Sequence, residues 1–233
     1  MKKIVVLTGA GISADSGLAT FRDSDGLWAS YRVEDVCTPE ALAHNRAEVI
    51  RFYNMRRREM IACEPNEAHL SIARLAKVCD VSIVTQNIDD LHERAGSQNV
   101  LHLHGELRKL RSSRNETATV PIVGWEQQLD ERHEDGSLLR PFVVFFGESV
   151  PMMDRAIEVM READILVIVG TSLNVYPAAG LVNYIRSNVK VYVVDPAAET
   201  DSFKRPYINN PIEYIAKRAA VGMPELVDRL IQE

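Results

Sequence analysis

Short apolar runs alternate with amphipathic segments along most of the chain. The run at 165–169 is apolar throughout, as is typical of strands buried on both faces of a parallel sheet. Other runs rich in β-branched residues also predict strands, and several segments between them have helical spacing. The predicted strands are 4–7, 81–85, 100–103, 142–146, 165–169 and 189–194. The predicted helices include 45–61, 65–78, 151–163, 177–185 and 224–231, with a further helix capped by Thr38 and begun at Pro39.

This alternation predicts the α/β class with a Rossmann-like, doubly wound parallel sheet. In such sheets, ligands bind outside the carboxyl ends of the strands. We expect the strand ends to share one crevice, and they carry Gly9, Gln86, His104, Gly170 and Asp195. The stretch 106–139 is mostly charged and polar, which predicts a loop-rich inserted subdomain.

The first strand runs into Gly9-Ala10-Gly11, and Ala14 completes a G-x-G-x-x-A pattern. Such a turn, followed by a helix beginning near Ser13, would bind phosphate at the helix N-terminus. In an ordinary dinucleotide fold, a second strand ending in an acid for the ribose hydroxyls would follow. Here the polar loop 21–26 follows instead. The alternative is a tight strand-to-helix turn that binds no nucleotide.

Composition and charge argue against several classes of function. The chain has 233 residues, 46% hydrophobic and 26% charged, as expected for a globular domain. A net charge of -6 argues against a generic nucleic-acid or anionic-membrane surface. The apolar run 4–7 is too short for a signal peptide, and no run approaches a membrane span. Three cysteines without a C-x-x-C pair (Cys37, Cys63 and Cys79) fit a reducing cytoplasm.

Several ordered motifs together resemble the sirtuin (Sir2) family of NAD-dependent protein lysine deacylases. These motifs are Gly9-Ala10-Gly11-Ile12-Ser13, Ser16-Gly17, Thr20-Phe21-Arg22, Thr85-Gln86-Asn87-Ile88-Asp89, His104-Gly105, the run from Arg140 to Glu148, and Gly170-Thr171-Ser172-Leu173. They span nearly the whole chain. The resemblance implies one catalytic unit over 1–233, with an NAD-binding core at roughly 1–35, 65–105 and 140–233 and a small subdomain at roughly 36–64 and 106–139.

The resemblance also implies how NAD, which is consumed as a co-substrate, would be bound. Backbone amides at the glycine turn would bind the pyrophosphate, while Phe21 and Arg22 would cover the reacting ribose and the nicotinamide side. Asn87 and Asp89 would anchor the ribose and the carboxamide, and Asp195 and Ala220 would lie at the adenosine end. The expected NAD-binding residues are Gly9, Ala10, Gly11, Ser13, Phe21, Arg22, Gln86, Asn87, Ile88, Asp89, Gly170, Thr171, Ser172, Asp195 and Ala220.

The same resemblance implies that His104 and Asn87 are catalytic. Release of nicotinamide lets the acyl oxygen of the substrate capture the sugar. His104 would then take a proton from a ribose hydroxyl, and the acyl group would leave on ADP-ribose. Histidine suits this role because its pKa lies near neutrality. A structural histidine at a strand end is the alternative for His104.

Acyl-lysine proteins or peptides are the implied partners, with neither nucleic acid nor membrane. In the family, an extended peptide adds as a strand between two segments, a form of β-augmentation. The Val144 carbonyl would receive the lysine side-chain N–H. The implied peptide-binding residues are Val144, Phe146, Gly147, Glu148, Leu173, Asn174 and Val175.

Tyr53 and Arg56 lie one helical turn apart, as in the sirtuins that remove acidic acyl groups. A guanidinium pairs bidentately with a carboxylate, and a phenol adds a donor. The pair therefore predicts a succinyl- or malonyl-lysine preference. The alternative is that Arg56 begins a solvated basic run with Arg57 and Arg58.

This sequence departs from the usual pattern of the family at the zinc site. The four slots of the usual cysteine pairs fall on Arg111, Arg114, Arg132 and Asp135. Structural zinc sites of this kind need thiolate or imidazole ligands, so we expect no zinc. We expect Asp135 to pair with one or more of these arginines in place of the metal.

Two other classes of function remain open from the sequence. One keeps the NAD site but transfers ADP-ribose to protein or hydrolyses NAD. The other is a non-catalytic NAD sensor or scaffold, against which Asn87, Asp89 and His104 argue.

Overall fold

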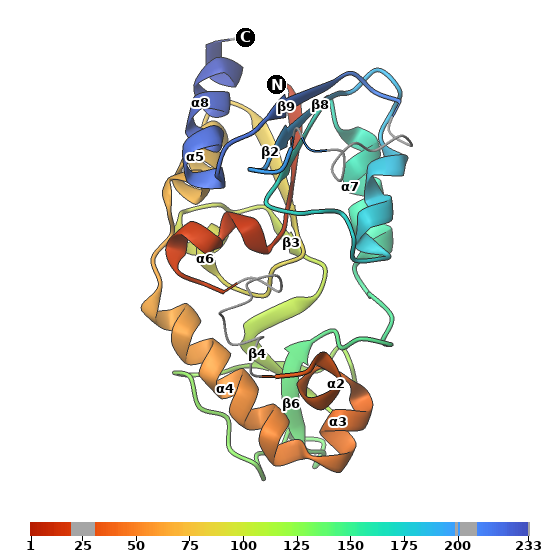
Figure 1. Cartoon of the computed structure of the whole chain (residues 1–233). Coiled ribbons are helices and arrows are strands. Elements are labelled where there is room, and N and C mark those ends of the chain that lie inside the picture. Colours follow the sequence, from red (N-terminus) through yellow and green to blue (C-terminus); the bar gives the residue numbers. More distant parts are fainter. Residues whose placement is uncertain (20–30, 199, 201–208, 233) are drawn as a thin grey trace.

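The computed structural model describes residues 1–19, 31–198, 200 and 209–232. Within these residues, a six-stranded parallel sheet forms one half of the molecule and a smaller sheet with helices forms the other (Figure 1). The large sheet has the order β3-β2-β1-β7-β8-β9. Its strands are β1 (Lys3–Thr8), β2 (Asp80–Thr85), β3 (Val100–His102), β7 (Ile165–Val169), β8 (Lys190–Val194) and β9 (Ile212–Ile215). The predicted doubly wound fold is confirmed.

Helices cover both faces of the large sheet, which explains its apolar strands. On one face, Val5 and Leu7 of β1 pack in a cluster with α7 (Met153–Glu162) and the 3₁₀ helix η3 (Ala178–Tyr184). On the other face, Ile4 and Val6 pack with α5 (Glu67–Leu75) and α8 (Ala219–Gln232). Figure 1 shows α5 and α8 on the opposite side of the sheet from α7. Because successive side chains of a strand point to opposite faces, every position must be apolar.

The small subdomain, as we use the name, consists of an antiparallel sheet with three helices packed on it. The sheet has the order β5-β4-β6, from β4 (Gly105–Ser112), β5 (Thr119–Pro121) and β6 (Leu139–Val143). The helices are α2 (Val33–Val36), α3 (Pro39–His44) and α4 (Arg46–Ala62). An apolar cluster containing Phe52, Leu107 and Phe145 joins them. The predicted cap of α3 is confirmed, because the Thr38 hydroxyl accepts from the Ala41 N–H at 3.1 Å.

The strands of the structure differ from the predicted ones in three places. The apolar run 142–146 is no strand of the large sheet: β6 ends at Val143 and pairs antiparallel with β4. Val143 and Phe145 of this run pack into the apolar cluster of the small subdomain, which accounts for part of its apolar character. β4 lies in the stretch predicted to be loop-rich, where intervening charged residues hide its buried leucines. β9 was not predicted at all.

Two helix predictions are also corrected. After the glycine turn, the chain forms two short 3₁₀ helices, η1 (Ala10–Ile12) and η2 (Ala14–Ser16), in place of the expected α-helix. A full helix dipole is therefore absent beside Ser13 in the described chain. At the other end, α8 begins at Ala219 and contains Pro224, which was predicted to open the helix. Proline lacks an N–H and is best tolerated in the first turn, so its position alone misplaced the start.

Glycines let the ends of β1 and β7 touch backbone to backbone. Gly9 donates its N–H to the Val169 carbonyl at 3.2 Å, and Gly11 donates to the Gly170 carbonyl at 2.8 Å. A Cβ on Gly170 would lie 2.2 Å from the backbone nitrogen of Ile12, and φ at Gly170 is +63°. A Cβ on Gly11 would lie 2.7 Å from the Gly170 Cα. Only glycine fits this contact, for steric and conformational reasons.

Arg57 joins α4 to the sheet of the small subdomain. Its side chain is fully buried. Nε donates to the Leu107 carbonyl at 2.7 Å, and Nη1 donates to the Trp125 carbonyl at 2.6 Å and to Asn54 Oδ1 at 2.9 Å. Burial lowers the pKa of the guanidinium to about 10. The basic run is therefore no solvated face, because its middle residue is a clamp between α4, β4 and the segment after β5.

The expected pairing of Asp135 with arginine is wrong. Its carboxylate accepts from the Ser112 hydroxyl at 2.6 Å and from the Ser137 N–H at 2.8 Å, and His133 lies 3.3 Å away. These contacts, the Ser112 hydroxyl first, hold the pKa of Asp135 well below its usual range. Short turns favour such local side-chain to backbone bonds over a distant ion pair. Arg132 donates instead to the Gly136 carbonyl at 2.7 Å.

The described residues contain neither a membrane-spanning helix nor a cluster of metal-binding side chains. No helix among them is long and apolar enough to cross a membrane. No group of three or more histidine, cysteine, aspartate or glutamate side chains in the described chain could hold a metal ion.

Replacing Gly170 tests the contact between β1 and β7. We expect Gly170→Ala to lower the free energy of unfolding by roughly 2–4 kcal/mol, because the new methyl group would meet the backbone of Ile12 at positive φ. The control is Gly180→Ala, whose Cβ meets nothing within 4 Å and which should stay within about 0.5 kcal/mol. Urea unfolding measures both, and equal losses would contradict the assignment.

The Arg57 clamp predicts a second stability difference. Arg57→Met would leave the buried Leu107 carbonyl and the partly buried Trp125 carbonyl without their donor, so we expect a loss of about 2–4 kcal/mol. Arg58→Met is the matched control, since Arg58 is exposed and its guanidinium lies 5.7 Å from the centre of the Trp125 ring. That variant should lose at most about 1 kcal/mol. Chemical denaturation of both variants decides, and a stable Arg57→Met would disprove the clamp.

Candidate functional site

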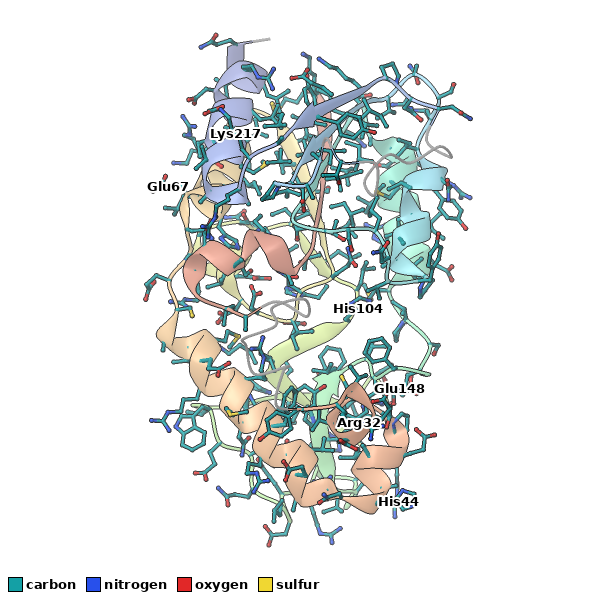
Figure 2. All side chains as sticks on the ribbon, in the orientation of Figure 1. Arg32, His44, Glu67, His104, Glu148 and Lys217 are labelled. Atoms are coloured by element: carbon teal, nitrogen blue, oxygen red, sulfur yellow. The ribbon has the colours of Figure 1, made fainter. Side chains whose placement is uncertain are left out.

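One cavity of about 350 Å³ lies between the carboxyl ends of the large sheet and the small subdomain. In Figure 2, His104 lies at this boundary and Glu148 lies below it in the small subdomain. All five predicted strand ends line the cavity: Gly9, Gln86, His104, Gly170 and Asp195. The topology therefore brings together side chains that are far apart in the sequence.

The glycine turn forms one wall of the cavity through Gly9, Ala10, Gly11 and Ser13. Two of the backbone N–H groups expected to bind phosphate already have acceptors in the chain. Gly11 donates to the Gly170 carbonyl at 2.8 Å, and Ser13 donates to the Ala10 carbonyl at 3.1 Å. The contact with Gly170 and the tight 3₁₀ turn thus use amides that a regular helix start would leave free.

Ser13, Asn87 and Asp89 form a buried polar network at the base of the cavity. The Asn87 amide donates from Nδ2 to Ser13 Oγ at 3.1 Å, and Ser13 donates to Asp89 Oδ2 at 3.0 Å. Asp89 Oδ1 also accepts from the Leu91 N–H at 3.2 Å. Burial raises the pKa of Asp89 despite these hydrogen bonds. The network fixes an amide and a carboxyl group beside the glycine turn.

His104 is oriented by a single backbone contact. Its Nδ1 lies 2.9 Å from the Gln86 carbonyl. A carbonyl can only accept, so Nδ1 carries the proton and neutral His104 has its lone pair on Nε2. Burial lowers the pKa of His104, partly offset by the Gln86 carbonyl. The side chain that lines the cavity is therefore a neutral base with a defined tautomer.

Tyr53 and Arg56 line the cavity where it enters the small subdomain. The Tyr53 phenol lies 3.0 Å from Cys37 Sγ, and its ring stacks on Phe145 at a centroid distance of 5.7 Å. Arg56 donates to Glu59 at 3.0 Å, and its side chain is 12% exposed. The phenol and the guanidinium thus lie on one face of α4, and the Tyr53 ring packs on the apolar side chain of Phe145.

The predicted peptide-binding segments are only partly at the cavity. Val144, Phe146, Gly147, Glu148 and Val175 line it. Leu173, fully buried, and Asn174 are not among the lining residues.

The Glu148 carboxylate is already occupied within the chain. It receives Arg140 at 2.6 Å, Arg111 at 3.2 Å and the Phe145 N–H at 2.8 Å. Its charge serves to shape the 144–148 loop.

The remaining predicted residues divide into three groups. Ile88, Thr171 and Ser172 line the cavity. Ala220 does not: it lies at the start of α8, where its N–H donates to Asp15 at 3.3 Å. Phe21 and Arg22 lie outside the described residues.

Several cavity residues were not predicted from the sequence. Phe52 and Met60 lie four residues either side of Arg56, so the helical repeat through Arg56 could have identified them. Cys37 and Leu107 come from separate elements, and only the fold brings them to Tyr53. The part of the cavity beside Tyr53 and Arg56 is therefore more apolar than the motif alone suggests.

Comparisons with known proteins agree with this geometry. Residues 9–177 match the Sir2 family. A relative from Aggregatibacter actinomycetemcomitans called NAD-dependent protein deacylase is 53% identical over 86% of this chain and 96% of its own length. Another of that name, from Bacteroides thetaiotaomicron, is 46% identical over 99% of both chains. A solved Sir2 homologue in complex with NAD superposes with a TM-score of 0.86 at 37% identity, covering 99% of this chain and 90% of that one. The chain belongs to the Sir2 family.

The tautomer and pKa of His104 give a testable pH dependence. The lowered pKa keeps the base neutral to below the ordinary histidine value of about 6.5. We expect the acid limb of the kcat/KM profile to lie at a pH below that value. We also expect ¹H–¹⁵N NMR to show the proton on Nδ1. Assignment uses His104→Asn, which removes one of six histidine signals. An Nε2–H tautomer, or a limb above about pH 7, would refute this reading.

Proposed function

We propose that this chain is an NAD-dependent protein lysine deacylase that favours acidic acyl groups, succinyl or malonyl, over acetyl. The observation that carries the proposal is the neutral His104 held beside the Ser13–Asn87–Asp89 network in one cavity. Family membership and the names of the relatives support the NAD-dependent deacylase activity.

The donor set at the base of the cavity suits NAD. The Asn87 amide and the Ser13 hydroxyl offer groups for a ribose hydroxyl, and the Asp89 carboxyl suits the amide of a nicotinamide carboxamide. When bound, NAD supplies the ADP-ribose that accepts the acyl group as nicotinamide leaves. The strand ends at Gly9, Gly170 and Asp195 are the remaining residues that we assign to this co-substrate.

His104 supplies the base for the reaction. With Nδ1–H held by the Gln86 carbonyl, Nε2 is the atom that would take a proton from a ribose hydroxyl. The imidazolium formed there would keep its Nδ1 hydrogen bond, so the ring would not need to turn. A positioned general base of this kind contributes roughly 10²- to 10⁴-fold in rate.

The cavity between α4 and the 144–148 loop would bind the acyl-lysine. Its walls are apolar at Phe52, Leu107 and Phe145, which suits the methylene groups of the lysine and the acyl chain. The Val144 carbonyl would accept the lysine N–H, and the loop edge would pair with an extended peptide. Such contacts bind the backbone of the substrate and leave its sequence largely free.

Arg56 and Tyr53 would bind the terminal carboxylate of an acidic acyl group. A guanidinium has five N–H donors, and Arg56 uses one on Glu59 at 3.0 Å and one on the Ala19 carbonyl at 3.4 Å. The remaining donors and the phenol suit a carboxylate. An acetyl group would leave these polar groups unpaired, which is the physical basis of the preference.

Replacing Arg56 tests the acyl preference. We expect Arg56→Met to reduce kcat/KM for a succinyl-lysine peptide by roughly 10- to 150-fold, because a charge-assisted hydrogen bond is worth about 1.5–3 kcal/mol. Turnover of the acetyl-lysine peptide should change by less than about threefold. The control is Arg58→Met on the exposed face of the same helix. A strong acetyl preference of the wild type that Arg56→Met leaves unchanged would contradict the proposal.

The products distinguish the reaction class. With NAD and acyl peptide, mass spectrometry should detect O-acyl-ADP-ribose and free lysine peptide. ADP-ribosylated protein would instead indicate an ADP-ribosyltransferase, and free ADP-ribose alone would indicate an NAD hydrolase. No turnover would indicate a non-catalytic NAD sensor or scaffold.

A further inference from the structure

His102 lies two residues before His104 and contacts the same loop. It ends β3, and its side chain is only 7% exposed. Its Nδ1 lies 2.9 Å from the Asn87 carbonyl, and its Nε2 lies 2.8 Å from Glu93 Oε1. His104 makes the equivalent Nδ1 contact with the preceding carbonyl, that of Gln86, at 2.9 Å. Two histidines therefore hold two successive peptide groups.

Both partners of His102 accept hydrogen bonds and cannot donate them. A carbonyl oxygen and an ionised carboxylate have no proton to give. Both contacts are satisfied together only when both ring nitrogens carry protons, which is the charged imidazolium. The geometry thus requires a cation at this position, in contrast to the neutral His104.

The backbone of Asn87 is fixed by these contacts from both sides. Its N–H donates to the Thr85 hydroxyl at 3.0 Å, and its carbonyl receives His102. Its side chain continues into Ser13 and from there to Asp89. The plane of the peptide after Asn87 therefore sets where its amide and the Asp89 carboxyl point.

We propose that charged His102, paired with Glu93, is a positioning residue that holds the 86–89 loop in its reactive arrangement, and that loss of its proton releases the Asn87 carbonyl. The proposal rests on the deacylase function for its catalytic consequence. His102 touches no reacting atom and acts only through Asn87.

The charges around His102 favour the cation. Glu93 and His92 face it from α6 (Leu91–Arg94), Glu106 faces it from β4, and Asp89 faces it from the loop itself. Burial alone lowers the pKa of His102, but the hydrogen bond and charge of Glu93, the Asn87 carbonyl and the charge of Glu106 outweigh it, so the pKa is raised. The imidazolium therefore persists above the ordinary histidine range.

Deprotonation has a defined result. The remaining proton stays on Nε2, because a hydrogen bond to a carboxylate is stronger than one to a carbonyl. Asn87 then loses its donor. Because the pKa of His102 is raised, its hydrogen bond to the Asn87 carbonyl is fully formed at low pH and is lost as pH rises through that pKa. With the lowered pKa of His104, this predicts a bell-shaped profile.

The test compares wild type with Glu93→Gln, His102→Gln and His102→Phe. In wild type, NMR should show the Ile88 backbone ¹⁵N shift, which reports on the Asn87 carbonyl, titrating together with His102. Glu93→Gln should move the pKa of His102 and the alkaline limb of kcat/KM together to lower pH. His102→Phe should abolish the alkaline limb and lower kcat/KM at neutral pH by about 3- to 10-fold. His102→Gln keeps a hydrogen-bond donor, so it should abolish the alkaline limb but leave kcat/KM at neutral pH within about threefold of wild type.

His133→Gln is the matched control, since His133 also pairs with a carboxylate, Asp135, at 3.3 Å but in the small subdomain. It should leave the profile unchanged. An Ile88 shift that ignores the His102 titration, or an alkaline limb unmoved by Glu93→Gln, would overturn the positioning role. If no deacylation occurs at any pH, the proposed function fails, and the Ile88 titration still decides whether His102 holds the loop.

Discussion

The backbone contact between the ends of β1 and β7 is the constraint on which the site depends. Gly11 and Gly170 approach so closely that a Cβ on either would overlap the other chain segment. This contact closes the turn into 3₁₀ geometry and places Ser13 where it meets Asn87 and Asp89. The glycines thus serve packing between strand ends, and the cavity follows from that packing. Their pattern looks like a phosphate-binding signature, but several of its amides already bond within the chain.

Arginines perform the second structural task, which is to join the helices and loops of the small subdomain to its own sheet. Arg57 supplies three hydrogen bonds inside it. Arg140 binds Glu148 at 2.6 Å and lies 3.9 Å over the Phe145 ring, which in turn stacks on Tyr53. Planar guanidinium groups satisfy several carbonyls at once, which suits a loop-rich region. The end of the cavity at Tyr53 and Arg56 is therefore positioned by buried cations, which contact it through stacked aromatic rings.

Two histidines that lie two residues apart, His102 and His104, differ in charge state because their partners differ. His104 bonds a single carbonyl and is otherwise buried, so the neutral form is favoured. His102 lies between a carbonyl and a carboxylate, so the cation is favoured. Both act on the same short loop after β2. Environment alone thus favours a neutral histidine and a charged one only two residues apart.

The sequence by itself determined five of the six strands of the large sheet, and the central ones most clearly, because a strand buried on both faces must be apolar at every position. It also predicted that the five strand ends would meet, since parallel strands present their carboxyl ends at one edge. Tertiary structure alone decided the rest. β6 joined the second sheet, Arg57 became buried, and His102 met Asn87 and Glu93. Local patterns record whether a residue tolerates burial, whereas its partners come from other elements, and only folding brings those elements within hydrogen-bonding distance.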